Sequence, residues 1–413
     1  MTTTADLTYL RPPTATDAHL AETFQPVFER IAEGSVERER DREFPHEQVQ
    51  WLKDRGLGVV RVPTAFGGYG ASLEQTFALL ADLGSADPNV AHIWRNHLAF
   101  VEDRLNAAPS ETNDRWLQRF RDREFVGGGW TEANNGTFAD LKTSVRRDGD
   151  GWRVDGAKFY ATGSLYADWL DVLGRDDDGG VLTALVRRAD PGVELLDDWD
   201  GFGQRTTASG TANYHGVPAR PGDVFPAGER FVYQGHFYQT AMLSVLVGIT
   251  RAVVRDGVAA LRARGRNYPQ ALDPSPTADA QLLQVIGQVS AHAFAAEAAL
   301  RASSRTLDHT AAAHAAGDLE ERRERLVEGE VATARAQLVI IDAALAATTT
   351  VFDALGASGV STTRALDRHW RNARTLASHN PRVYKARILG DWYVNGTDPV
   401  PNLAERGRGG QGD

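Results

Sequence analysis

The spacing of apolar residues changes twice along the chain, and this change constrains the fold more than any single motif. Stretches such as "AHLAETFQPVFERIAE" repeat apolar residues with a helical period, and "FPHEQVQWLKDRGL" has a proline near its start and a glycine near its end. In the middle third, short alternating runs such as "SVRRDGDGWRVDGAKFYATGS" are separated by Gly, Asp and Pro turns, which predicts antiparallel strands. Long helical patterns return from about residue 233. We predict an α+β chain with an N-terminal helical domain (1–123), a middle β-barrel domain (124–232) and a C-terminal helical bundle domain (233–413).

The C-terminal part contains several long helical patterns with short connections. They include "TAMLSVLVGITRAVVRDGVAALRAR", an alanine-rich segment over 279–316, a third pattern that begins at "LEERRERLV", and a last helix around 364–378. Four such helices predict an up-down four-helix bundle. Because helices of this length commonly bury a second face against copies of themselves, we also expect a homo-oligomer, and specifically a homotetramer.

Composition argues against several classes of protein. The 413 residues carry a formal net charge of -10, which argues against a nucleic-acid partner because phosphate neutralisation needs a basic surface. No uninterrupted apolar run reaches the roughly 18 residues of a membrane helix, and the N-terminus lacks the pattern of a secretory signal, so we expect a cytoplasmic protein without a membrane partner. The absence of cysteine excludes disulfides, thiolate nucleophiles, zinc-thiolate sites and iron-sulfur clusters.

Common catalytic and nucleotide-binding motifs are missing. The chain has no G-x-G-x-x-G between a strand and a helix, no P-loop, no G-x-S-x-G and no H-E-x-x-H. His92 and His97 lie five residues apart, as do His309 and His314. On a helix such pairs project about 140° apart, whereas metal ligands prefer spacings of three or four. We therefore predict no metal site.

A basic segment, "RHWRNARTLASHNPRVYK" over 368–385, stands out in this acidic chain. His379 precedes the helix-ending pair Asn380-Pro381, and the surrounding positive charge favours a neutral imidazole that can exchange a proton near neutral pH. Few carboxylates are near the arginines in the sequence, so we expect them to meet an anionic cofactor or an acidic partner subunit rather than only solvent. For His97, a core or interface imidazole is the simpler interpretation of the residues alone.

Four signatures in order resemble the acyl-CoA dehydrogenase superfamily over almost the whole chain. They are "VPTAFGGYGAS", "WTEANNGTFADL", "VDGAKFYATGSLYADWL" and "DWDGFGQRTTASGTANYHGVPA". The C-terminal stretch that begins "ALDRHWRNARTLASHNPRVYK" and the segment "NVAHIWRNHLAF" are similar to the flavin-dependent monooxygenase branch that dibenzothiophene monooxygenase typifies. The resemblance implies an acyl-CoA dehydrogenase-like fold with a flavin between the β domain and the bundle.

The resemblance also implies roles for individual residues. His97, Thr162 and His379 would be catalytic, with the two histidines beside the reactive edge of the flavin and Thr162 near its N5. Residues expected to bind the cofactor are Trp130, Thr131, Thr162 and Ser209 around the ring and Arg266, Arg371 and Arg374 at the phosphate. Substrate contacts are expected from Trp94, Phe138 and Phe202. Two departures from the branch are Ser358, where relatives tend to carry a phosphate-binding arginine, and Leu376, where dibenzothiophene monooxygenase has histidine.

The implied reaction is oxygenation by a two-component enzyme. Reduced FMN, delivered by a separate reductase, would react with O2 to form a C4a-hydroperoxyflavin. Hydroxyl and imidazole donors in a dry pocket would protect this species. One oxygen atom would then pass to a small hydrophobic or heteroaromatic substrate, most readily to a sulfur atom. FAD is the less favoured cofactor.

Other reactions stay open on the sequence. The same chemistry at nitrogen or at an aromatic carbon would make the protein an N-hydroxylase or an aromatic hydroxylase. An acyl-CoA dehydrogenase needs a carboxylate base, and the region 355–380 offers only Asp367. A flavin-free binding homologue is a further alternative.

Overall fold

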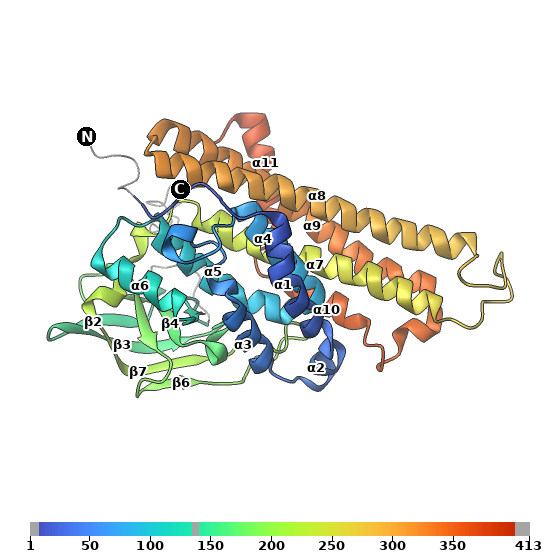
Figure 1. Cartoon of the computed structure of the whole chain (residues 1–413), viewed down its shortest axis with the longest axis horizontal. Coiled ribbons are helices and arrows are strands. Elements are labelled where there is room, and N and C mark those ends of the chain that lie inside the picture. The colour runs from blue at the N-terminus through green and yellow to red at the C-terminus, as the bar shows by residue number, and fades with distance from the viewer. Residues whose placement is uncertain (1–7, 134–139, 401–413) are drawn as a thin grey trace, which may run out of the picture.

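The computed structural model describes residues 8–133 and 140–400 of the chain. Two elongated parts meet side by side: helices and a sheet form one body, and a bundle of long helices extends away from it (Figure 1). The helix-to-strand transition falls between Arg121 and Val126, and the return to helix falls at Gln234.

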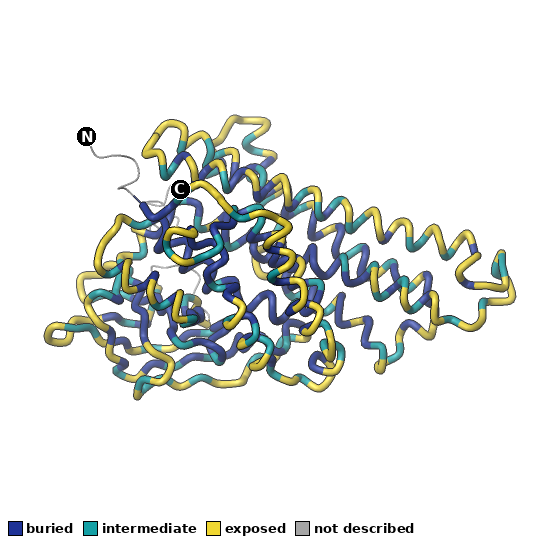
Figure 2. The backbone as a smooth tube through the Cα atoms, viewed as in Figure 1, coloured by how far each residue is buried: buried dark blue, intermediate teal, exposed yellow. Residues whose placement is uncertain are grey.

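Six α-helices form the N-terminal part: α1 (Asp17–Ala32), α2 (Ser35–Asp41), α3 (His46–Arg55), α4 (Leu73–Ala86), α5 (Pro88–Asn106) and α6 (Glu111–Arg121). Local chemistry explains why α4 and α5 begin where they do. The Ser72 side chain accepts from the Gln75 amide while the Gln75 side chain accepts from the Ser72 amide, and the Asp87 carboxylate accepts from the amides of Asn89 and Val90. α5 is buried along nearly its whole length and lies at the centre of the molecule, where the buried segments gather (Figure 2).

The middle part is one eight-stranded sheet, and not the β-barrel that the sequence predicted. Its strands are β1 (Val126–Gly129), β2 (Ser144–Asp148), β3 (Gly151–Lys158), β4 (Trp169–Arg175), β5 (Val181–Arg187), β6 (Val193–Leu195), β7 (Ala212–Ala219) and β8 (Val224–Pro226). The order is β6-β7-β3-β2-β4-β5-β8, with β1 parallel to β4. In the described part of the chain the outer strands β6 and β8 are not paired with each other, so the sheet stays open. Each of these strands is only three residues long.

Three long helices form the bundle: α7 (Gln234–Arg262), α8 (Ala280–Ala316) and α9 (Leu319–Leu355). The last helix, predicted around 364–378, is α10 (Asp367–Ala377), and a further short helix that was not predicted, α11 (Arg382–Asn395), follows it. The chain leaves helical geometry at the Asn380-Pro381 step because proline restricts the residue before it and cannot donate a backbone hydrogen bond. The helical C-terminal domain was therefore predicted correctly, and α10 is much shorter than the other three predicted helices.

α7 joins the two parts of the molecule. It crosses α4 where Gly84 faces Val245 and Gly248; a Cβ on Gly248 would lie 2.4 Å from the carbonyl oxygen of Ala81, so only glycine permits this approach. By length and composition, α7 and the segment Leu319–Val360 are apolar enough to cross a membrane, but 83% of the apolar window of α7 is buried inside the protein. The apolar character of α7 is thus explained by its place in the core.

Candidate active site

Helix α5 carries two of the polar side chains of the site, His92 and Arg95. His92 and Arg95 are three residues apart, so they lie on the same side of the helix. Arg95 Nη1 lies 2.9 Å from Nε2 of His379, which follows α10, and His92 Nδ1 lies 3.0 Å from Oε1 of Gln204. Segments from three distant parts of the sequence therefore meet at one end of α5.

The geometry fixes where the ring protons of these histidines reside. Since a guanidinium only donates, Nε2 of His379 accepts from Arg95 and the ring proton is on Nδ1. His92 donates from Nδ1 to the Gln204 carbonyl oxygen, which leaves its Nε2, a buried atom without a partner in the described part of the chain, as an acceptor. The site thus offers one imidazole donor and one imidazole acceptor.

Both imidazoles are neutral. Burial, and then the charge of Arg95, lower the pKa of His92 well below its usual value. Burial of the imidazole, and then Arg95, lower the pKa of His379 to about 3, although the residue as a whole is exposed to solvent. Each ring can therefore donate or accept a hydrogen bond without carrying charge at neutral pH.

A chain of hydroxyl groups connects α5 to the sheet. Thr162 and Ser209 lie 2.7 Å apart, Ser209 and Thr207 are also 2.7 Å apart, and the Thr207 hydroxyl donates to the carbonyl oxygen of Gln204 over 2.8 Å. Asn96 of α5 donates to the backbone oxygen of Thr162. Thr162, Thr207 and Ser209 are buried, and because the Thr207 proton points to Gln204, Ser209 donates to Thr207 and Thr162 donates to Ser209. The pre-oriented row therefore presents acceptor oxygens to a ligand.

The backbone beside this row is held in unusual conformations. Tyr160, Gln204 and Ala208 have φ angles of 59°, 53° and 52°, in the left-handed region that residues other than glycine rarely adopt. Such strain is concentrated at functional sites, where the surrounding structure holds it in place. All three lie next to residues of the hydroxyl row or the histidine pair.

Helix α7 packs beside the same region as α5 and the hydroxyl row. The ring of Tyr238 lies 5.5 Å from the Arg95 guanidinium and 6.2 Å, between centroids, from the ring of Trp130. Asn380 donates to Oε1 of Gln239 over 2.7 Å, which fastens the segment that carries His379 to α7. Trp130, at the end of β1, therefore faces the same region as Arg95 and His379.

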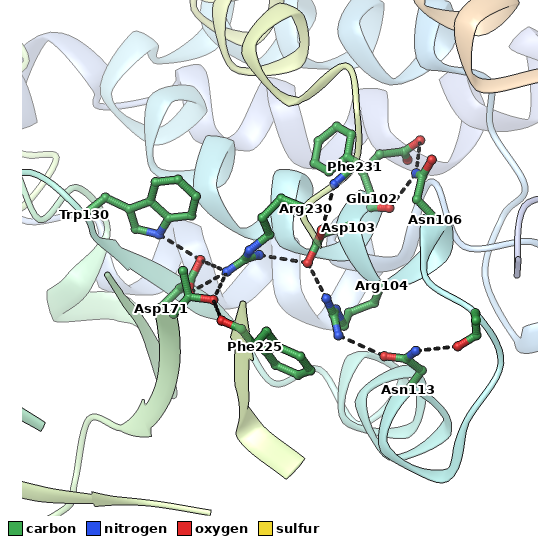
Figure 3. A network of polar contacts seen from close by, with 12 residues as sticks. Glu102, Asp103, Arg104, Asn106, Asn113, Trp130, Asp171, Phe225, Arg230 and Phe231 are labelled. Atoms are coloured by element: carbon green, nitrogen blue, oxygen red, sulfur yellow. Dashed lines mark hydrogen bonds and ion pairs between the residues drawn. The ribbon is translucent and has the colours of Figure 1, made fainter. Parts of the chain in front are cut away.

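A buried network of charges holds Trp130 in place (Figure 3). Its Nε1 donates to Asp171 of β4 over 3.0 Å, and Asp171 accepts from Arg230 Nη2 at 2.7 Å. Arg230 also donates to Asp103 of α5 at 2.9 Å. The network joins α5, the sheet and the start of α7, so it fixes the walls of the site relative to one another.

The structure brings together four of the residues that the sequence predicted: Trp130, Thr162, Ser209 and His379. Thr131 adjoins Trp130, but its side chain is exposed and its carbonyl oxygen accepts from the amide of Phe159. Phe138 lies outside the described residues. Phe202 is exposed and stacks on Trp370 at 5.7 Å, away from the histidine pair.

The prediction that His97 is catalytic was wrong. Its Nδ1 accepts from the Val126 amide, its Nε2 faces the Gly58 carbonyl oxygen at 3.1 Å, and its ring stacks on Phe125. Burial lowers its pKa to about 4. His97 is thus a core histidine whose ring nitrogens are both occupied, and Trp94, predicted to contact substrate, packs beside it in the same cluster.

The expectation that the basic segment meets a cofactor was also wrong for most of its arginines. Arg371 pairs with Glu39 and Asp367, both at 2.8 Å, and Arg368 pairs with Asp256 at 2.5 Å. Arg382 pairs with Asp342. Among the described residues, the Arg374 side chain donates to the hydroxyl of Ser378. Apart from Asp367, which lies four residues before Arg371 in α10, the carboxylates come from distant segments, so the basic run serves mainly to dock α10 and α11.

Arg266 lies at the opposite end of the bundle, in the connection between α7 and α8. With Arg264, Arg364 and Ser358 it lines a cavity of about 500 Å³. Ser358 donates to the carbonyl oxygen of Leu355. Leu376 is buried on α10 and takes no polar part.

Three residues of the site escaped the sequence analysis: His92, Arg95 and Gln204. The available signal was the pair of polar residues at helical spacing within the buried pattern "NVAHIWRNHLAF". Nothing in the sequence near Gln204 indicates that its side chain meets α5.

With this geometry in view, the comparisons with known proteins assign the family. Residues 15–124 match the family model for the acyl-CoA dehydrogenase N-terminal domain, and residues 241–382 match that for the acyl-CoA dehydrogenase C-terminal domain. The chain belongs to the acyl-CoA dehydrogenase superfamily.

Individual relatives point to one branch of that superfamily. The chain is 28% identical to dibenzothiophene monooxygenase of Mycolicibacterium goodii, over 89% of this chain and 92% of the relative. It is also 28% identical to a Pseudomonas putida protein named "Probable FMNH2-dependent monooxygenase SfnC", over 91% and 94%. Among solved structures, FMN-bound TdsC from Paenibacillus sp. A11-2 superposes with a TM-score of 0.81 at 26% identity, covering 92% of this chain and 98% of that one.

Proposed function

We propose that this protein is a flavin-dependent monooxygenase that uses reduced FMN and O2 to oxygenate a small hydrophobic or heteroaromatic substrate at sulfur. The observation that carries the proposal is the meeting of two neutral imidazoles with a row of buried hydroxyl groups. The names of the relatives, which include dibenzothiophene monooxygenases and an FMNH2-dependent monooxygenase, support both the reaction and the cofactor.

The residues present fit an isoalloxazine ring. Trp130 and Tyr238 offer aromatic surface, and the hydroxyl oxygens of Thr162 and Ser209 and the unpartnered Nε2 of His92 offer acceptors. When bound and reduced, FMN would supply two electrons and the site of O2 activation. The protein would supply orientation, hydrogen bonds and a shielded environment.

Each side chain then has a defined task. The Nδ1 proton of His379 is available for donation toward the oxygen that leaves as water, and Nε2 of His92 can accept a hydrogen bond from the bound group. Because Thr207 donates to Gln204, Ser209 donates to Thr207 and Thr162 donates to Ser209, so the Thr162 oxygen would accept a hydrogen bond from the flavin ring. Apolar residues of α5 and α7 would exclude water.

The phosphate and the assembly are parts of the same proposal. Arg371 is engaged by two carboxylates, so Arg266, reached from a neighbouring copy in a homotetramer, and Arg374 are the better candidates to bind the phosphate. A separate reductase would deliver reduced FMN. FAD is less favoured because the relatives named above use FMN.

Dehydrogenation fits the site less well. Asp367, the acid expected in this region, is exposed and forms an ion pair with Arg371. No carboxylate pairs with the Arg95 and His379 cluster in the described part of the chain. A base that removes a proton from a thioester is thus not provided there.

The test is single-turnover oxidation in a stopped-flow spectrometer. Protein mixed with photoreduced FMN, O2 and dibenzothiophene or methyl phenyl sulfide should yield sulfoxide in proportion to the flavin oxidised. His379→Ala and Thr162→Ala should divert the reaction to hydrogen peroxide, while the surface control His215→Ala should not. Stoichiometric peroxide without product from the wild-type protein, with every sulfide and amine tried, would refute the proposal.

A further inference from the structure

Arg95 differs from the other buried arginines of the described residues in its lack of a carboxylate partner. In the described part of the chain, each of the other arginines that is buried forms a salt bridge with a carboxylate: Arg38 with Asp87, Arg61 with Glu102, Arg104 with Asp103, Arg230 with Asp103 and Asp171, and Arg368 with Asp256. Arg95 is 9% exposed and has no carboxylate within salt-bridge distance among the described residues.

None of the groups around Arg95 carries a negative charge. Nη1 donates to neutral His379, and the ring of Tyr238 lies on the other side. Burial raises the pKa of Tyr238, so its phenol stays protonated, and His92 is neutral as described above. Arg95 Nε is buried and has no hydrogen-bond partner in the described part of the chain.

A buried guanidinium without a counter-ion is costly, because desolvation of the charge is not offset by a partner. Such a group persists where a ligand supplies the missing charge. Arg95 borders His379, which is exposed at the rim, so an anion can reach both groups from solvent. The planar guanidinium matches a two-oxygen anion such as a carboxylate or a sulfinate.

We propose that Arg95 is the specificity-determining residue of the site and that the substrate is a small organic anion whose sulfinate or carboxylate group Arg95 binds. The inference rests on the proposed monooxygenase function and narrows its substrate class. For a sulfinate the reaction balances as RSO2⁻ plus reduced FMN plus O2 giving RSO3⁻, FMN and water. The sulfur lone pair forms the new S–O bond, the O–O bond breaks, and the second oxygen leaves as water with the two hydrogens of the reduced flavin.

A matched pair of probes tests the charge alone. Benzenesulfinate and methyl phenyl sulfoxide have nearly the same shape, differ by O⁻ against CH3, and each gains one oxygen on oxidation. Their binding to the FMN-loaded protein is measured by titration calorimetry and needs no turnover. We expect the wild-type protein to bind the sulfinate at least about 10-fold more tightly than the sulfoxide.

Variants of Arg95 then test whether this side chain binds the negative charge of the sulfinate. Arg95→Met should weaken sulfinate binding by about 10- to 100-fold and leave sulfoxide binding within about 3-fold, and Arg95→Lys should restore part of the loss. Arg301→Met, which removes an equal charge from an exposed position of α8, should change neither affinity. Thermal unfolding of each variant verifies that it is folded.

The outcomes separate this inference from the proposed function. Equal binding of the two probes by the wild-type protein, or an Arg95→Met variant that keeps its sulfinate affinity, would overturn the inference even if sulfides are oxygenated. Loss of FMN affinity in place of sulfinate affinity would also overturn it, because the charge would then serve the flavin. Sulfinate binding that depends on Arg95, without oxygenation of any probe, would support the inference and refute the monooxygenase.

Discussion

Arg230 and Arg95 are both buried arginines that border the same site, yet their surroundings are opposite. Arg230 is held by Asp103 and Asp171 in the network of Figure 3, and its charge is balanced within the fold. Arg95 faces only a neutral imidazole and a neutral phenol. The contrast separates an arginine that stabilises the interface between domains from one whose charge is kept for a ligand.

The largest expected effect is a difference between Arg230 and Arg95 in how their replacement changes the free energy of unfolding. Arg230→Met leaves two buried carboxylates short of a partner and should lower the free energy of unfolding by about 3–5 kcal/mol. Arg95→Met removes a buried charge that has no counter-ion, so the free energy of unfolding should stay the same or rise. Urea unfolding followed by circular dichroism measures both. Equal losses in the two variants would abolish the comparison.

The second prediction concerns catalytic activity, which should depend on the residues around Arg95 and not on the Arg230 network. His379→Ala removes the imidazole that accepts from Arg95, and we expect oxygenation to fall by about 100-fold or more, as for loss of a general acid. The folded state should persist, because His379 is exposed and makes no contact with the Arg230 network. Product formation under single turnover is the measurement, and a variant with unchanged product yield would remove His379 from the mechanism.

Low pH should lower the free energy of unfolding through protonation of His97. Burial lowers its pKa to about 4, against about 6.5 in the unfolded chain, so the unfolded state binds the extra proton between these values. Stability contributed by neutral His97 is therefore lost as pH falls from about 6.5 toward 4, with a slope of up to about 1.4 kcal/mol per pH unit. His97→Gln should reduce this slope between pH 5 and 6 relative to wild type. An unchanged slope would show that His97 does not titrate as described.

The smallest effect concerns the edge of the Arg230 network. Trp130→Phe removes one hydrogen bond to Asp171, which keeps Arg230 as a partner, so we expect a loss of only about 1 kcal/mol in the free energy of unfolding. Urea unfolding measures this loss, and FMN titration reports any separate effect on the flavin. A loss as large as that of Arg230→Met would mean that Trp130, and not the ion pair, maintains the network.

The sequence predicted the parts of the site that lie in distinctive local motifs. Thr162 and Ser209 were predicted through the family resemblance of the motifs that contain them, and His379 was also indicated by its place before the Asn380-Pro381 step. The roles of the two histidines of α5 could not be predicted from the sequence. His92 and His97 lie five residues apart on one helix, and the sequence does not say which side of the helix meets His379 and which meets Phe125.

Pairing across long distances explains the other errors. The pairing of Arg371 with Glu39 was not accessible because the two residues lie 332 positions apart in the chain, whereas its other partner, Asp367, is only four residues away. The sheet could not be distinguished from a barrel because closure depends on whether β6 meets β8, and alternation of residues along a strand does not specify that. Asn380-Pro381 correctly marked the end of the helix predicted around 364–378, but the short helix α11 beyond it was not predicted.

The sequence by itself determined the order of helical and β domains, the family resemblance and the hydroxyl and imidazole groups in local motifs, because periodicity and turn chemistry act over a few residues. Only the tertiary structure decided that His92 faces the site while His97 is part of the core, and that Arg95 alone among the described buried arginines has no carboxylate partner. The physical reason is that burial and charge compensation depend on which distant segments pack together, and no local pattern carries that information.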